Sequence, residues 1–80
     1  MSPDDIRDRI RASLPDAEVE LEDLTGTKDH WKARITSAAF AGRSAIERHR
    51  IVNRALAEEL RGPIHALTME LYAPGEPRAS

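Results

Sequence analysis

The sequence has no cysteine, few aromatic residues and no long apolar run. Without cysteine the chain forms no disulfide, so a reducing compartment is permitted and an oxidising one is not excluded. No apolar stretch approaches the ~20 residues that span a bilayer. The acidic start, Met-Ser-Pro-Asp-Asp, lacks the apolar region of a signal peptide. We therefore expect a cytoplasmic protein with no membrane partner.

Eighty residues, 40% hydrophobic and 32% charged, predict one small globular domain. Because the only aromatic residues are Trp31, Phe40 and Tyr72, the core must consist mostly of Ile, Leu, Val and Ala. The formal net charge of −2 argues against strong nonspecific nucleic-acid binding. The charges are uneven, with acids gathered in 16–23 and arginines in 43–54. The sequence carries no Gly-x-Ser-x-Gly, phosphate-loop or HExxH motif, so we do not expect an enzyme.

The first element expected is a helix that starts at Ser2 and stops at Pro15. Ser2 is a good N-cap, Pro3 suits the first helical position, and the next two aspartates complement the helix dipole. Ile6, Ile10 and Leu14 then form one apolar stripe.

Two strands are expected next, at 19–22 and 31–36, since apolar and charged residues alternate in both. The polar loop 25–29 between them favours an antiparallel hairpin, with acidic side chains of the first strand beside basic ones of the second. A second helix starts at Ser44, which forms a capping box with Glu47, and runs to about Arg61. An interruption within this helix is compatible with the sequence.

A third strand is expected over 64–72 after Gly62-Pro63. The order α-β-β-α-β predicts an α+β domain with helices on one face of a three-stranded sheet. The helical crossover makes the last strand parallel to one neighbour. From Pro74 onward the composition is typical of a disordered tail. We place the domain at 1–76 and the tail at 77–80.

Four blocks of this sequence resemble the BolA family over roughly residues 4–76. They are Phe40-Ala41-Gly42, Arg48-His49-Arg50-Ile51-Val52-Asn53, Leu56-Ala57-Glu58-Glu59-Leu60 and Ile64-His65-Ala66-Leu67. The resemblance implies a class II KH-like fold. It also implies a partnership with monothiol glutaredoxins around a bridging [2Fe-2S] cluster, in iron–sulfur trafficking or iron sensing.

The family's metal-binding histidine matches His65. A second family ligand, Cys or His, lies in the hairpin loop, where this chain has His30, so the resemblance is to a histidine-type subgroup. Since such a cluster needs four ligands, the glutaredoxin and its bound glutathione would supply the other two, and the chain alone binds no cofactor. A homodimer of the apo chain is a further partner expectation.

Each histidine also has a structural interpretation that does not involve metal binding. Taken by spacing alone, His65 is a core histidine at a strand start and His30 an exposed loop residue. Asp29 is a candidate hydrogen-bond acceptor that would orient the ring of His30. His49 falls on the apolar side of the second helix, with Ile46, Val52 and Leu56, so we expect it to be buried or half-buried. A supporting role near His65 is the alternative.

The arginines of the second helix are candidate partner-binding residues: Arg43, Arg50, Arg54 and Arg61. They suit phosphates or the carboxylates of an acidic partner such as glutathione. The plain alternative is a solvated face with helix pairs such as Arg54 with Glu58.

Three functions follow, of which the favoured one is a non-enzymatic adaptor sharing a glutaredoxin cluster. The second is a nucleic-acid-binding transcriptional regulator of the stress-response kind, using the arginine face. Against it, the Gly-x-x-Gly loop of a KH domain is missing, because Arg-Ser-Ala follows Gly42. The third is an interaction module that binds glutaredoxin without metal.

Overall fold

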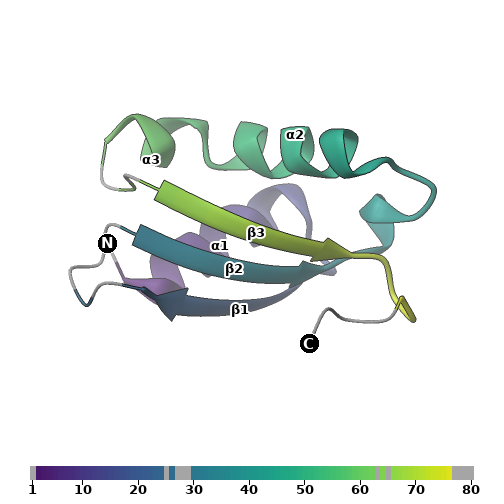
Figure 1. The fold of residues 1–80 in the computed structure, drawn as a ribbon, viewed down its shortest axis with the longest axis horizontal. Helices are drawn as coiled ribbons and strands as arrows, with labels where there is room; N and C mark the ends of the chain where they lie inside the picture. Colours follow the sequence, from purple (N-terminus) through teal and green to yellow (C-terminus); the bar gives the residue numbers. More distant parts are fainter. Residues whose placement is uncertain (1, 25, 27–29, 63, 65, 77–80) are drawn as a thin grey trace.

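The computed structural model describes residues 2–24, 26, 30–62, 64 and 66–76. The elements follow in the order α1 (Pro3–Ser13), β1 (Glu18–Asp23), β2 (His30–Thr36), a 3-10 turn η1 (Ala38–Phe40), α2 (Ala45–Ala55), α3 (Ala57–Arg61) and β3 (Ala66–Tyr72) (Figure 1). This confirms the predicted α+β class and element order. Within the ranges given above, no helix is long and apolar enough to cross a membrane.

The sheet has the order β1-β2-β3. β1 and β2 form the expected antiparallel hairpin, with Glu20 opposite Arg34. β2 and β3 are parallel, with His30 opposite Ala66 at one end and Thr36 opposite Tyr72 at the other. Both predictions of strand direction are confirmed.

The helices cover one face of the sheet, as predicted. Ile6 and Ile10 of α1 and Val52 of α2 are fully buried in one cluster with the inward side chains of the strands. Figure 1 shows α1 behind the sheet and α2 running beside β3. The inward side chains of β1 and β2 are Val19, Trp31, Ala33 and Ile35.

The uncovered face of the sheet carries a chain of ion pairs across all three strands. Arg34 of β2 lies 4.0 Å from Glu20 of β1 and 3.1 Å from Glu70 of β3, and Lys32 lies 3.4 Å from Glu70. The expected acidic and basic strand faces therefore do lie together. Such partly exposed pairs contribute roughly 0.2–1 kcal/mol each, so they favour the register more than they stabilise the fold.

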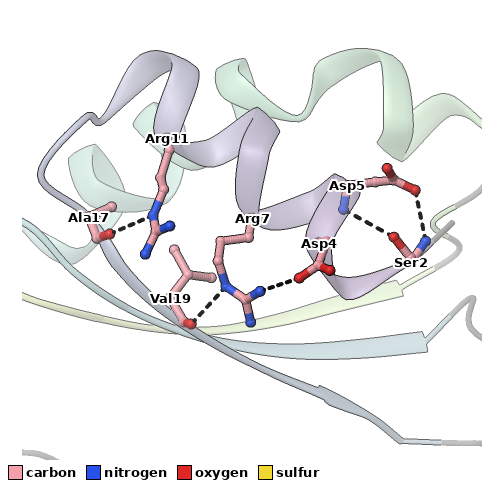
Figure 2. A network of polar contacts seen from close by, with 7 residues as sticks. All are labelled: Ser2, Asp4, Asp5, Arg7, Arg11, Ala17 and Val19. Atoms are coloured by element: carbon pink, nitrogen blue, oxygen red, sulfur yellow. Dashed lines mark hydrogen bonds and ion pairs between the residues drawn. The ribbon is translucent and has the colours of Figure 1, made fainter.

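The N-terminal helix is capped as predicted and also covers the edge of the sheet. The hydroxyl of Ser2 accepts a hydrogen bond from the Asp5 amide at 3.2 Å, and the Asp5 carboxylate accepts one from the Ser2 amide at 3.0 Å. On the next turns, Arg7 donates to the Val19 carbonyl and Arg11 to the Ala17 carbonyl (Figure 2). These arginines occupy edge carbonyls that would otherwise be open to another strand.

The second helix is interrupted after Ala55, as the sequence allowed, although the sequence did not mark the place. Leu56 leaves helical geometry (φ −110°, ψ 22°) and separates α2 from α3. No proline or glycine causes the break. Leu56 is fully buried, and the new direction of α3 brings the buried Glu59 to Arg9 of α1 at 2.9 Å. Tertiary packing therefore overrides the local helix pattern.

Arg48 ties the start of α2 to the end of β3. Its guanidinium makes two bonds to the Glu76 carboxylate, at 2.7 and 2.9 Å, and donates to the Leu71 carbonyl at 3.1 Å. Glu76 also accepts from the Ala73 amide. The expectation of disorder from Pro74 onward is therefore wrong for 74–76, because the Arg48 pair orders that turn. Residues 77–80, the tail placed outside the domain, lie outside the described residues.

We expect Arg9→Ala to destabilise the fold, because it leaves the Glu59 carboxylate without its cation while that side chain is only 7% exposed. Arg9 itself is 60% exposed, so we scale the cost of breaking a buried pair down to about 1–2 kcal/mol. Chemical denaturation would measure it. Arg9→Ala in a Glu59→Gln background should cost much less, and equal losses in both backgrounds would contradict the pair.

The Arg48 pair predicts a specific acid sensitivity. The Arg48 guanidinium and the Ala73 amide lower the pKa of Glu76 from 4.5 to about 2. The ionised carboxylate therefore stabilises the folded state above pH 4.5, and this stabilisation is lost as the pH falls toward 2. Glu76→Gln should lower Tm at neutral pH and reduce the fall in Tm on acidification, as measured by thermal unfolding. Glu58→Gln, an exposed acid of α3, is the control and should keep the wild-type pH profile.

Candidate functional site

His30 is the first residue of β2 and is half-buried. The sequence pattern assigned it to the hairpin loop, and this placement is wrong by one strand position. The reason is that the His30 carbonyl accepts from the Leu24 amide at 2.9 Å, which extends the hairpin, while Ala66 of β3 pairs with His30 on the other side. His30 is therefore held by backbone on both sides.

His65 and Asp29 lie outside the described residues, so their predicted roles stay predictions. The two chain neighbours of His65 are described. The Ile64 amide donates to the Glu59 carbonyl at 2.9 Å, and the Ile64 side chain is buried. Ala66 is paired with His30. The backbone on either side of residue 65 is thus anchored at the end of the sheet that carries His30.

The described residues bring one predicted ligand, His30, to this end. They contain no group of three or more His, Cys, Asp or Glu side chains placed to hold a metal ion. A half-buried imidazole at a strand end suits a metal ligand, but a [2Fe-2S] cluster requires four. The metal ligands that the chain can offer therefore account for only part of such a site.

His49 is exposed, so the expectation that it is buried or half-buried is wrong. With Ile46 and Arg50 it lines a shallow hollow on the outer side of α2. It also borders a second hollow with Leu71 and Tyr72, near the carboxyl end of β3. His30 lies at the amino end of the neighbouring strand β2, so His49 and His30 are at opposite ends of the sheet.

The error arises from the orientation of α2. At 100° per residue, Arg48 and Leu56 lie about 40° to either side of Val52 on the helix wheel. Both of these side chains turn inward: Leu56 is fully buried, and Arg48 reaches the sheet end with 14% of its side chain exposed. The buried face is thus centred on Val52, and His49 and Ile46 fall outside it. Arg48 is charged, so its hydrophobicity alone assigns it to solvent, but its side chain lies on the inward face of α2.

All four predicted partner-binding arginines are exposed. Arg43 forms an ion pair with Glu47 at 3.4 Å. Among the described residues, Arg54 makes no ion pair with Glu58, so that alternative is not seen, and Arg50 also has no acidic partner. The four arginines do not form one cluster. Arg43 precedes α2 and lies near the end of β3, whereas Arg61 ends α3 and lies near the start of β3.

Sequence reasoning missed Ile46, which was assigned to the apolar side and is 66% exposed. It also gave no role to Arg48 or Glu59. The ties of Arg48 to Glu76 and of Glu59 to Arg9 join residues far apart in the chain, so no local pattern could have identified them.

Comparison with known proteins gives the same assignment from sequence and from structure. The family model described as BolA-like protein matches residues 10–76. BolA-like protein 1 of Homo sapiens is 35% identical over 78 residues, which are 89% of this chain and 57% of the relative. The chain thus spans little more than half the length of that protein.

Two further relatives indicate different settings for the same domain. The structure of the BolA domain of SufE1 from Arabidopsis thaliana has a TM-score of 0.83 and 30% identity, covering 96% of this chain and 99% of that one. The Vibrio cholerae protein called DNA-binding transcriptional regulator BolA is 43% identical over 51 residues, covering 64% of this chain and 48% of the relative. Element order, sheet topology and sequence agree: the chain belongs to the BolA-like family.

Proposed function

We propose that this chain is a non-enzymatic adaptor that pairs with a monothiol glutaredoxin to share a bridging [2Fe-2S] cluster, in iron–sulfur cluster trafficking or iron homeostasis. The observation that carries the proposal is the register of β2 and β3, which pairs His30 with Ala66, the residue after His65. Because His30 is held beside the residue that follows His65 in the chain, we propose that the two imidazoles bind a single iron atom.

The ligand count makes a partner necessary. The chain contributes two imidazoles and has no cysteine, while the cluster takes four ligands. The missing pair is a cysteine of the glutaredoxin and the thiolate of its bound glutathione. In such a complex the two imidazoles would hold one iron and the two thiolates would hold the other.

The imidazoles also set the properties of this shared site. Replacing two thiolates with neutral histidines raises the reduction potential of a [2Fe-2S] centre and removes negative charge from it. A histidine ligand must be deprotonated at the metal-binding nitrogen, so acid competes with the metal. This makes release of the cluster sensitive to pH.

Of the predicted partner-binding arginines, Arg61 is the one we assign to this partner. Arg61 ends α3, directly before the chain that leads through Ile64 to β3. A guanidinium there suits the carboxylates of glutathione, which it can bind with two hydrogen bonds.

Mixing the apo chain with a glutaredoxin that carries a [2Fe-2S] cluster should change the visible circular dichroism spectrum. His65→Ala and His30→Ala should each abolish or alter that change, because one iron loses a ligand. His49→Ala is the matched control, since this third histidine is exposed at the opposite end of the sheet. If His65→Ala gives the wild-type spectrum, the ligand assignment is wrong.

Calorimetry of the same mixtures separates the adaptor from an interaction module without metal. The adaptor predicts that glutaredoxin binding weakens at least about tenfold when the cluster or either ligand is missing. Glutaredoxin binding that is unchanged by loss of the cluster and of both histidines would instead support the interaction module.

The second candidate function is a nucleic-acid-binding regulator. The Vibrio cholerae relative is named as a DNA-binding regulator, and Arg50 and Arg54 are exposed here without an acidic partner among the described residues. The net charge of −2 weakens this candidate.

If DNA binds this face, its affinity must fall steeply with salt. Arg50→Ala or Arg54→Ala should weaken binding and reduce the slope of log affinity against log salt by about one each. Fluorescence anisotropy with duplex DNA over a range of salt concentrations measures both. Lys32→Ala, on the uncovered sheet face, should leave the slope unchanged. Absence of binding at low salt would remove this candidate.

A further inference from the structure

An exposed isoleucine lies on α2 where the fold gives it no role. Ile46 is 66% exposed, in the first turn of a helix whose buried face is formed by Val52 and Leu56. Isoleucine is also a poorer helix former than the straight-chain residues that suit exposed helix positions. Neither packing nor helix propensity accounts for Ile46, and a single exposed apolar side chain is by itself unremarkable on a protein surface. The residues around Ile46 decide whether its exposure indicates a binding surface.

Ile46 lies in a hollow of about 290 Å³ that it shares with Ala45, His49, Arg50 and Asn53. Ala45 and Ile46 contribute apolar groups to the hollow, and Asn53 and Arg50 contribute an amide and a charged group. Protein-binding surfaces combine apolar and polar groups in this way. We call this set of five residues the α2 surface.

Positive charge predominates in the helix segment that carries the α2 surface, while Glu70 of β3 lines the neighbouring hollow with Ala45 and His49. The only acid between Arg43 and Ala57 is Glu47, and its carboxylate already accepts from the Ser44 amide and pairs with Arg43. Arg50 has no acidic partner among the described residues. An acidic partner would satisfy Arg50, whereas a basic one would be repelled.

The α2 surface is separate from the end of the sheet that carries His30. Arg48, one turn after Ala45, bonds to the Leu71 carbonyl near the end of β3, whereas His30 is paired with Ala66 at the start of β3. Ala66 and Tyr72 are six strand positions apart, which is roughly 20 Å at 3.3 Å per residue. A ligand of the α2 surface is therefore not a ligand of His30.

We propose that the α2 surface is a second docking surface, which binds an acidic protein segment that places an apolar side chain against Ile46. This goes beyond the glutaredoxin partnership and does not depend on it. An acidic protein segment fits better than nucleic acid, because phosphates offer nothing to the exposed apolar side chain of Ile46.

The test is an NMR titration of the full ¹⁵N-labelled chain with a synthetic helical peptide that carries one leucine among glutamates. We expect shifts at the amides of residues 45–53. Ile46→Ser and Arg50→Glu should each weaken binding about fivefold or more, in line with burial of one aliphatic side chain or loss of one ion pair. Replacing the peptide's leucine with serine should weaken it similarly.

Two control variants isolate the surface. Arg61→Glu makes the same charge change at the end of α3, and Leu24→Ser removes another exposed large apolar side chain, which is 49% exposed. Both should bind the peptide within about twofold of wild type, as should His30→Ala, which distinguishes this proposal from the glutaredoxin site.

Several outcomes would overturn the proposal. They are shifts centred outside residues 45–53, equal binding of the leucine-free peptide, or duplex DNA binding these amides more tightly than the acidic peptide at the same salt. Sedimentation of the chain alone tests whether a second copy of the chain binds the α2 surface. Self-association that Ile46→Ser abolishes would show that it does, and would overturn the proposal.

Discussion

The central strand β2 is the constraint on which the rest of the structure depends. It pairs with β1 on one side and β3 on the other, so its alternation sets the two faces of the whole sheet. Trp31, Ala33 and Ile35 point into the core. Because side chains alternate with a period of two, a slip of one residue would bury Lys32 and Arg34 and break their pairs with Glu70. The same register places His30 beside Ala66.

Arginines then fasten the helices to this sheet. Arg7 and Arg11 of α1 bond to carbonyls at the β1 edge, Arg9 pairs with the buried Glu59 of α3, and Arg48 of α2 pairs with Glu76. In a small domain with a modest aliphatic core, these ties fix helix orientation where packing alone leaves it weakly determined. A second class of arginines, such as Arg50, faces solvent without an acidic partner among the described residues. The first class holds elements of the fold together, whereas the second is exposed to solvent.

This difference explains which features the sequence could predict. The N-cap at Ser2, the capping box at Ser44 and the alternation of β2 depend on residues a few positions apart, and they were predicted correctly. The place of the break at Leu56 and the ordered turn at Glu76 depend on partners distant in the chain, and they were not. In the Arg-His-Arg block the helix wheel assigns His49 to the core, but the tie between Arg48 and Glu76 rotates that face away. His30 was identified by family resemblance, and its position in a strand came only from the structure.

The separation of the two ends of the sheet bears on the proposal that this cysteine-free chain shares a [2Fe-2S] cluster. A chain with two imidazoles holds only half of the ligands, so its affinity for the cluster depends on the partner that brings the rest. If the chain shares a cluster with a glutaredoxin as proposed, its histidines are bound to that cluster, and selection of a recipient would use surface away from the histidines. The carboxyl end of β3, with α2 beside it, is the part of the fold farthest along the strands from His30, and it is there that Arg50 and Ile46 lie exposed.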